Sequence, residues 1–185
     1  MFKKYGVLGI FLILLVEINF FYKLQPFANW YFPIIWFGYI LTIDAVNKKI
    51  SGKSLISNNG NKFLGIVIIS SLIWWIFEFG NIGLNNWTYQ GIIFRNAALR
   101  SLFGTLSFST VLPAFFETYE LIRNIHLFDH NKLKKKHNIT KNFLSLMIGL
   151  GVISLILPFL FPRYAFPLVW TSFFFILDPL NYLHQ

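Results

Sequence analysis

The chain contains no cysteine, and only 12% of its residues are charged. Without cysteine it can form no disulfide, no thiolate metal site and no cysteine nucleophile, which excludes several enzyme classes. The scarcity of charge, together with 56% hydrophobic and 20% aromatic residues, is typical of a polytopic membrane protein. We therefore expect an all-α fold in which residues 1–185 form a single transmembrane domain.

Common catalytic signatures are also missing. The sequence has no phosphate-cradling glycine loop, no nucleophile elbow and no zinc-protease pair. Its four histidines fall at or beyond the ends of the apolar runs, which gives no support to a bis-histidine haem inside a membrane. His126 and His130 flank Asp129 at a spacing that permits a metal site on a helix, but a solvated loop is the better interpretation. We expect neither a cofactor nor a metal.

Six apolar runs are long enough to cross a bilayer core of about 30 Å. They cover residues 5–22, 30–47, 63–82, 102–125, 142–161 and 165–183. The first run follows two lysines, as in a signal peptide, but no small-x-small cleavage site comes after it, so we interpret it as a retained helix. Pro113 interrupts the fourth run and leaves the carbonyl of Ser109 without its helical partner, which nearby hydroxyls could compensate.

Basic residues are distributed unevenly between the two predicted sides of the membrane. Of sixteen lysines and arginines, twelve fall on one side, whereas Lys23, Arg95, Arg100 and Arg163 fall on the other. Cytoplasmic loops carry the excess of positive charge, so this split predicts six spans with both termini in the cytoplasm. It also explains the net charge of +9 without nucleic acid. We expect a multi-pass protein of the inner (plasma) membrane.

Acidic residues are rare, and almost all lie inside the runs. Six of the seven do so, namely Glu17, Asp44, Glu78, Glu117, Glu120 and Asp178. A carboxylate in a spanning helix is unfavourable unless it is protonated, paired or facing a protected cavity, so it indicates a functional site by default. Glu117 and Glu120 share a helix face, and two close carboxylates in a low-dielectric environment should not both ionise.

The acids suggest a site with an aromatic wall. Asn81 follows Glu78 on the same helix face, and two tryptophans precede Glu78 by one turn. The candidate acid–base residues are Glu78, Glu117 and Asn81. The candidate contacts to a bound molecule are Trp74, Trp75, Tyr39 and Glu17. We expect Glu78 to face the interior, near Glu117, Thr110 or Tyr39.

An alternative is that the acids hold helices together as protonated or paired residues, which we favour for Asp44 and Asp178 near helix ends.

The second and sixth runs share a pattern. Phe32-Pro33-x-x-Trp36-x₇-Asp44-x-x-Asn47 recurs as Phe166-Pro167-x-x-Trp170-x₇-Asp178-x-x-Asn181, with each residue displaced by 134. Both runs cross from outside to inside, so the pattern predicts a partial parallel repeat in which the second and sixth helices are equivalent. A counterpart of Glu78 would fall beyond residue 185. We expect further helices or a partner subunit to complete the second repeat.

Several of these motifs resemble a group of uncharacterised bacterial polytopic membrane proteins. The matching residues are Trp74-x-x-Phe77-Glu78-x-x-Asn81, Asn86-Trp-x-Tyr89 and the two Asp-x-x-Asn helix ends. In that group, a second Trp-Glu-x-x-Asn helix follows a stretch that matches Leu177 to Tyr182. The resemblance covers most of the chain but implies no activity.

Three function classes fit the sequence. The first is an intramembrane enzyme that uses Glu78 or Glu117 for acid–base chemistry on a lipid or isoprenoid-like substrate. The second is a proton- or cation-coupled transporter with the same acids as a relay. The third is a non-catalytic subunit of a membrane complex. All three predict contact with membrane lipids, and none involves nucleic acid.

Overall fold

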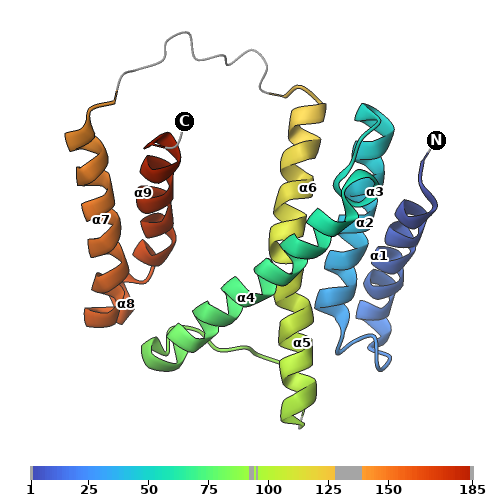
Figure 1. Ribbon diagram of the computed structural model, residues 1–185. Coiled ribbons are helices and arrows are strands. Elements are labelled where there is room, and N and C mark those ends of the chain that lie inside the picture. Colours follow the sequence, from blue (N-terminus) through green and yellow to red (C-terminus); the bar gives the residue numbers. More distant parts are fainter. Residues whose placement is uncertain (1, 92–93, 95, 128–138, 184–185) are drawn as a thin grey trace. The chain divides into compact units, whose positions relative to one another are not determined.

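The computed structural model describes residues 2–91, 94, 96–127 and 139–183, and all regular structure in these ranges is helical (Figure 1). The helices are α1 (Lys4–Tyr22), α2 (Tyr31–Ser51), α3 (Leu55–Asn58), α4 (Gly60–Leu84), α5 (Ala97–Ser109), α6 (Val111–Asn124), α7 (Lys141–Leu160), α8 (Pro162–Ala165) and α9 (Leu168–Leu183). The predicted all-α class is confirmed.

Four helical stretches are long and apolar enough to cross a membrane, judged by length and composition. They are α1, α4, the stretch Ala97–Asn124 formed by α5 and α6, and α7. This finding agrees with a polytopic membrane protein. Among the other predicted spans, α9 has 16 residues, or about 24 Å at 1.5 Å per residue.

The chain divides into two compact units. The first comprises residues 1–77 and 90–132, and the second comprises residues 78–89 and 133–185. Helix α4 therefore begins in the first unit and ends in the second.

In the first unit, α2 is the central helix, with α1, α3, α5 and α6 packed around it. Helices α1 and α2 come close together at two glycines, Gly9 and Gly38. A Cβ atom added to Gly9 would lie only 2.6 Å from the carbonyl oxygen of Gly38 and from Oγ1 of Thr42. Small residues of this kind allow two helix backbones to come close together in a membrane.

The break that Pro113 predicts is present, since α5 ends at Ser109 and α6 begins at Val111. Helix α4 contacts the chain at this break. The Ser70 hydroxyl donates a hydrogen bond to the carbonyl oxygen of Phe108 and accepts one from the amide of Leu112 at 3.0 Å. Backbone groups freed inside an apolar layer need such partners. Ser70 therefore joins α4 to both halves of the interrupted helix.

In the second unit, α7 and α9 form a close pair. A Cβ atom added to Gly151 would lie 3.1 Å from the carbonyl oxygen of Ser172 and 3.2 Å from the amide nitrogen of Ile176. The last turns of α4 and the segment that follows belong to the same unit, and the ring of Trp87 packs 5.3 Å from that of Phe166.

Candidate functional site

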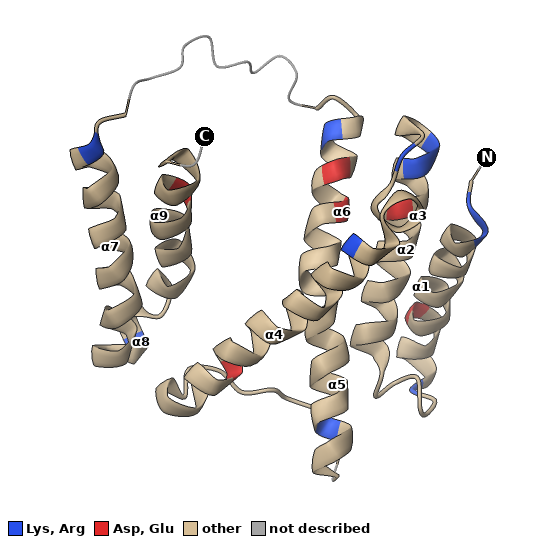
Figure 2. Ribbon diagram, viewed as in Figure 1, with Lys and Arg blue, Asp and Glu red and all other residues tan. Residues whose placement is uncertain are grey.

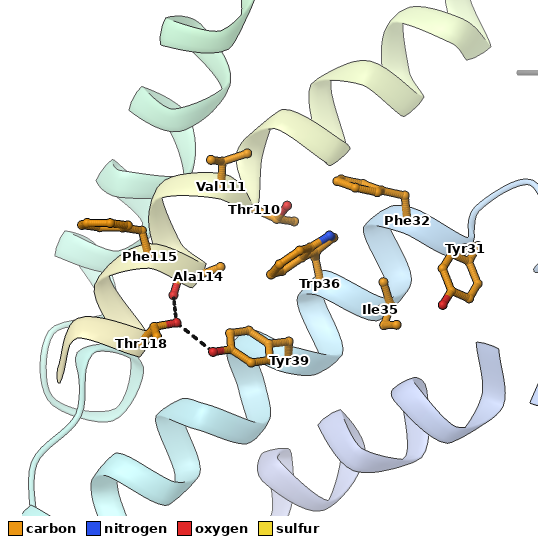
Figure 3. Close-up of a pocket in the computed structure, with 10 residues that line it drawn as sticks. All are labelled: Tyr31, Phe32, Ile35, Trp36, Tyr39, Thr110, Val111, Ala114, Phe115 and Thr118. Atoms are coloured by element: carbon orange, nitrogen blue, oxygen red, sulfur yellow. Dashed lines mark hydrogen bonds between the residues drawn. The ribbon is translucent and has the colours of Figure 1, made fainter. Parts of the chain in front are cut away.

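An apolar groove of about 680 Å³ lies between α2 and the α5–α6 stretch (Figure 3). Its walls include the side chains of Phe32, Trp36 and Tyr39 from α2, and Val111 and Phe115 from α6. The rings of Trp36 and Tyr39 meet edge to face, with their centroids 5.6 Å apart. Aromatic side chains in this arrangement give the groove a rigid apolar wall.

The hydroxyl groups that line the groove already have partners. The Tyr39 hydroxyl lies 2.7 Å from Oγ1 of Thr118, which donates its own proton to the carbonyl oxygen of Ala114 at 2.6 Å. The Tyr39 hydroxyl is therefore the donor in the first of these bonds. Dashed lines mark both bonds in Figure 3. The groove offers a ligand mainly apolar contact.

A buried polar cluster lies behind the groove wall, between α2 and α6. Asp44, Asn47 and Glu117 all have 0% of their surface exposed. The Asn47 side-chain amide donates to both the carbonyl oxygen and Oε2 of Glu117, each at 3.0 Å. The amide of Asn124, two turns after Glu117, donates to Oδ1 of Asn47 at 3.0 Å. These bonds tie α6 to α2.

Asp44 connects the same cluster to α1 and α3. Its carboxylate accepts hydrogen bonds from the hydroxyl of Tyr5 and, at 2.8 Å, from the backbone amide of Ile56. The Asp44 carboxyl also acts electrostatically on Glu117. Asp44 therefore ties both α1 and α3 to α2.

Glu117 retains one unused acceptor, because its buried Oε1 atom has no hydrogen-bond partner among the described residues. Ala114 and Thr118, its neighbours on α6, line the groove, whereas the Glu117 side chain bonds to α2. Glu117 is thus close to the groove wall but is not part of its lining. It can exchange a proton with a bound molecule only if that wall opens.

Glu78 and Asn81 organise the segment after α4 in the second unit. Oε1 of Glu78 accepts hydrogen bonds from the Trp87 indole at 3.1 Å and from the Tyr89 hydroxyl. The Asn81 amide donates to the carbonyl oxygen of Trp87 at 2.8 Å, and its oxygen accepts from the amide of Asn86 at 2.9 Å. Both side chains thus fold this segment back onto the end of α4.

The expected proximity of Glu78 to Glu117, Thr110 or Tyr39 stays a prediction, because those three residues belong to the other compact unit.

The residues predicted to contact a ligand lie in different parts of the structure. Tyr39 lines the groove, and Glu17 accepts a 2.6 Å hydrogen bond from Tyr31, another lining residue. Trp74 and Trp75 instead pack against Phe108 of α5, with ring centroids 6.2 and 5.5 Å away. The Trp75 indole also donates to Oγ1 of Thr105 at 3.1 Å.

No family model, curated protein or solved structure matches the chain. Its site must therefore be interpreted from its own residues. Within the described ranges, no group of three or more histidine and acidic side chains could hold a metal ion. Asp129 and His130 of the histidine-flanked segment lie outside those ranges.

Sequence reasoning missed several residues of the site. Tyr5 and Thr118 are hydroxyl residues within apolar helices, and nothing in their spacing identifies their partners. Asn47 was part of the repeated Asp-x-x-Asn pattern, so the repeat was a signal for its importance. The signal did not indicate that Asn47 binds Glu117.

Proposed function

We propose that this protein holds the hydrocarbon part of a lipid or isoprenoid-like molecule in the α2–α6 groove and performs acid–base chemistry on it. The groove is the observation that carries the proposal. Its volume of about 680 Å³ falls within the range of ligand pockets in proteins, about 300–1,000 Å³. Aromatic walls and satisfied hydroxyls suit a flexible apolar chain better than a polar solute.

Glu117 is the acid–base group that best fits this proposal. It is buried, its Oε1 atom has no hydrogen-bond partner in the described part of the chain, and its backbone forms part of the helix that closes the groove. A carboxyl that keeps a proton in an apolar environment can act as a general acid and, once ionised, as a base. Glu78, in its hydrogen bonds with Trp87 and Tyr89, is the second candidate for this role.

A non-catalytic role is favoured by a separate observation. The side chains of Asp44 and Asn47 use their hydrogen bonds to join α1, α3 and α6 to α2. Buried polar residues commonly hold membrane helices together in this way. In this second interpretation the chain is a structural subunit whose groove holds a membrane lipid.

We further propose six membrane spans with both termini cytoplasmic, in the inner (plasma) membrane, with α2 and α9 equivalent in a parallel repeat. Basic residues support this topology. Lys48 and Lys49 lie in the last turn of α2, and Arg123 lies in the last turn of α6. Figure 2 shows blue segments, which are lysine or arginine, at the same end of these two neighbouring helices, as the positive-inside rule requires of a cytoplasmic face.

The groove can be tested with a diazirine-bearing isoprenoid alcohol in nanodiscs of phosphatidylethanolamine and phosphatidylglycerol. We expect photolabelling of α2 and α6 peptides, and we expect Val111→Trp to reduce it strongly by filling the groove. Val152→Trp is the matched control, because Val152 is 46% exposed on α7. Equal labelling of both variants would show that the probe reports only general contact with lipid.

Acid–base chemistry can be tested without knowing the substrate. Mass spectrometry would compare the small molecules that co-purify with the unmodified protein and with Glu117→Gln. Glutamine keeps the size and the hydrogen-bond acceptor of glutamate but cannot titrate, so the variant should accumulate a substrate that the active protein converts. Glu120→Gln, three residues along α6, is the control. Identical co-purified molecules in all three samples would favour the structural interpretation.

A further inference from the structure

The two close helix pairs cross at equivalent positions. In the first pair, Gly9 faces the carbonyl oxygen of Gly38 and the amide nitrogen of Thr42, which lies one turn later on α2. In the second pair, Gly151 faces the carbonyl oxygen of Ser172 and the amide nitrogen of Ile176. Ser172 and Ile176 are Gly38 and Thr42 displaced by 134, the displacement of the Asp-x-x-Asn pattern.

The correspondence continues along both first helices. Val16 and Pro158 each lie seven residues after the crossing glycine, and both are fully buried. Four residues before that glycine, α1 carries Tyr5, which bonds to Asp44. The equivalent position on α7 is Met147, which lines a small cavity together with Asp178. The pair α7–α9 thus repeats the packing of α1–α2, although a thioether replaces the tyrosine hydroxyl.

The two pairs differ in how exposed the second helix is within its own unit. On α2, Ile40, Asp44 and Asn47 all have 0% exposure. The residues displaced by 134 on α9 are Phe174, Asp178 and Asn181. All three are exposed, and Phe174 has 58% of its surface accessible.

In the first pair, α6 covers the Asn47 end of this face, whereas the Asp44 carboxylate is bonded to Tyr5 of α1 and Ile56 of α3. Helix α6 brings Glu117 and Asn124, which lie seven residues apart on one side of the helix, to the side chain of Asn47. A carboxylate and an amide on an apolar helix favour a polar partner over contact with lipid. Interhelical hydrogen bonds to such residues are a recognised source of helix association in membranes.

We propose that the α9 face formed by Phe174, Asp178 and Asn181 is a docking surface for one helix that carries a carboxyl and an amide seven residues apart, as α6 does. The occupant is specified by the first pair, in which Asn47, the equivalent of Asn181, binds a helix with that spacing. The inference rests on the proposed equivalence of α2 and α9. It does not depend on what the groove binds.

The test uses the full chain in nanodiscs and a synthetic peptide of residues 97–127 as the probe helix. Cysteines can be placed without background because the chain has none. In the first pair, Tyr39 lies beside Thr118, and the residue displaced by 134 from Tyr39 is Phe173. A chain with Phe173→Cys should therefore cross-link through a short bismaleimide to a peptide with Thr118→Cys. A chain with Tyr39→Cys and Thr118→Cys is the intramolecular positive control.

Specificity comes from changes to the proposed surface. We expect the double variant Asp178→Ala with Asn181→Ala to reduce the yield of the cross-link about tenfold. A peptide with Glu117→Ala and Asn124→Ala should reduce the yield by the same factor. Leu183→Ala, an exposed position on the same helix, should leave it unchanged. Absence of the cross-link, or its persistence in the double variants, overturns the proposal.

Two further outcomes are distinguishable in the same experiment. A cross-link between two copies of the Phe173→Cys chain that excludes the peptide also overturns the proposal, because a second copy would then cover the face. Loss of isoprenoid labelling in the groove is a separate result that leaves this proposal intact.

Discussion

The helix pairs α1–α2 and α7–α9 cross in the same way but place the same polar motif in opposite environments. Asp44 and Asn47 are completely buried and fully engaged with α1, α3 and α6. Asp178 and Asn181 are exposed on α9. The comparison teaches that the Asp-x-x-Asn pattern does not by itself make a site. The helix that covers the pattern decides whether its residues are structural, reactive or available for binding.

The largest effect is expected where the first pair is tightest. Gly9→Leu places a side chain against the backbone of α2, 2.6 Å from the carbonyl oxygen of Gly38, where no flexible group can give way. We expect a loss of about 3 kcal/mol in the free energy of unfolding, measured by denaturant titration in detergent micelles. Gly65→Leu on α4 is the control, since no atom lies within 4 Å of a Cβ there. Equal losses in both variants would contradict the close crossing.

A smaller loss is expected at the equivalent position of the second pair. In Gly151→Leu the nearest atom is the side-chain Cγ1 of Ile176, which can rotate, and the backbone atoms of α9 are 3.1 Å away or more. We expect a loss of about 2 kcal/mol in the free energy of unfolding, measured by the same titration. Gly149→Leu, which meets nothing within 4 Å, should be close to neutral. If Gly149→Leu is the more damaging change, α7 and α9 cross elsewhere and the correspondence with α1–α2 fails.

The next largest loss of stability is expected on replacing the asparagine of the repeated motif. Asn47→Ala removes both hydrogen bonds to Glu117 and leaves the Asn124 amide without its partner, so we expect a loss of about 1.5 kcal/mol. Asn181→Ala changes an exposed residue and should cost less than about 0.5 kcal/mol when the chain is studied alone. Thermal unfolding of the two variants in the same detergent measures the difference, and matching losses would show that both faces are equally covered.

The smallest change in stability is expected from restoring the tyrosine hydroxyl that the second pair lacks. Met147→Tyr puts a phenol where Tyr5 stands in the first pair, within reach of Asp178. A single new hydrogen bond to this exposed side chain should add about 0.5 to 1 kcal/mol to the free energy of unfolding. Met147→Phe supplies the ring without the hydroxyl and is the control. A tyrosine variant no more stable than the phenylalanine variant would mean that the two positions are not equivalent.

The positions of the helices were largely readable from the sequence. The apolar runs 5–22 and 142–161 correspond to α1 and α7 within one residue at each end, because length and hydropathy determine where a helix fits in an apolar layer. The last run was predicted from residue 165, but α9 begins at Leu168 after the short helix α8 and Pro167. Proline cannot donate a backbone hydrogen bond, which explains the later start.

The candidate site was less predictable. Glu117 stood out as a carboxylate in an apolar run, yet its partner Asn47 lies 70 residues away on another helix. Helical periodicity places a residue on a face but does not say which helix that face meets. The groove could not be predicted for the same reason, because Trp36 and Phe115 become neighbours only when α2 packs against α6. The repeat was the one long-range signal in the sequence.

The contact of Ser70 with the break between α5 and α6 has a mechanical consequence. Thr110 at the break and Asn124 at the end of α6 are 14 residues apart, or about 21 Å along the helix. A swing of about 10° at the break would move Asn124 by about 4 Å, more than the length of its hydrogen bond to Asn47. The Ser70 hydroxyl, bonded to residues on both sides of the break, restrains that swing. By restraining the angle between α5 and α6, Ser70 helps to keep the C-terminal end of α6 in contact with Asn47.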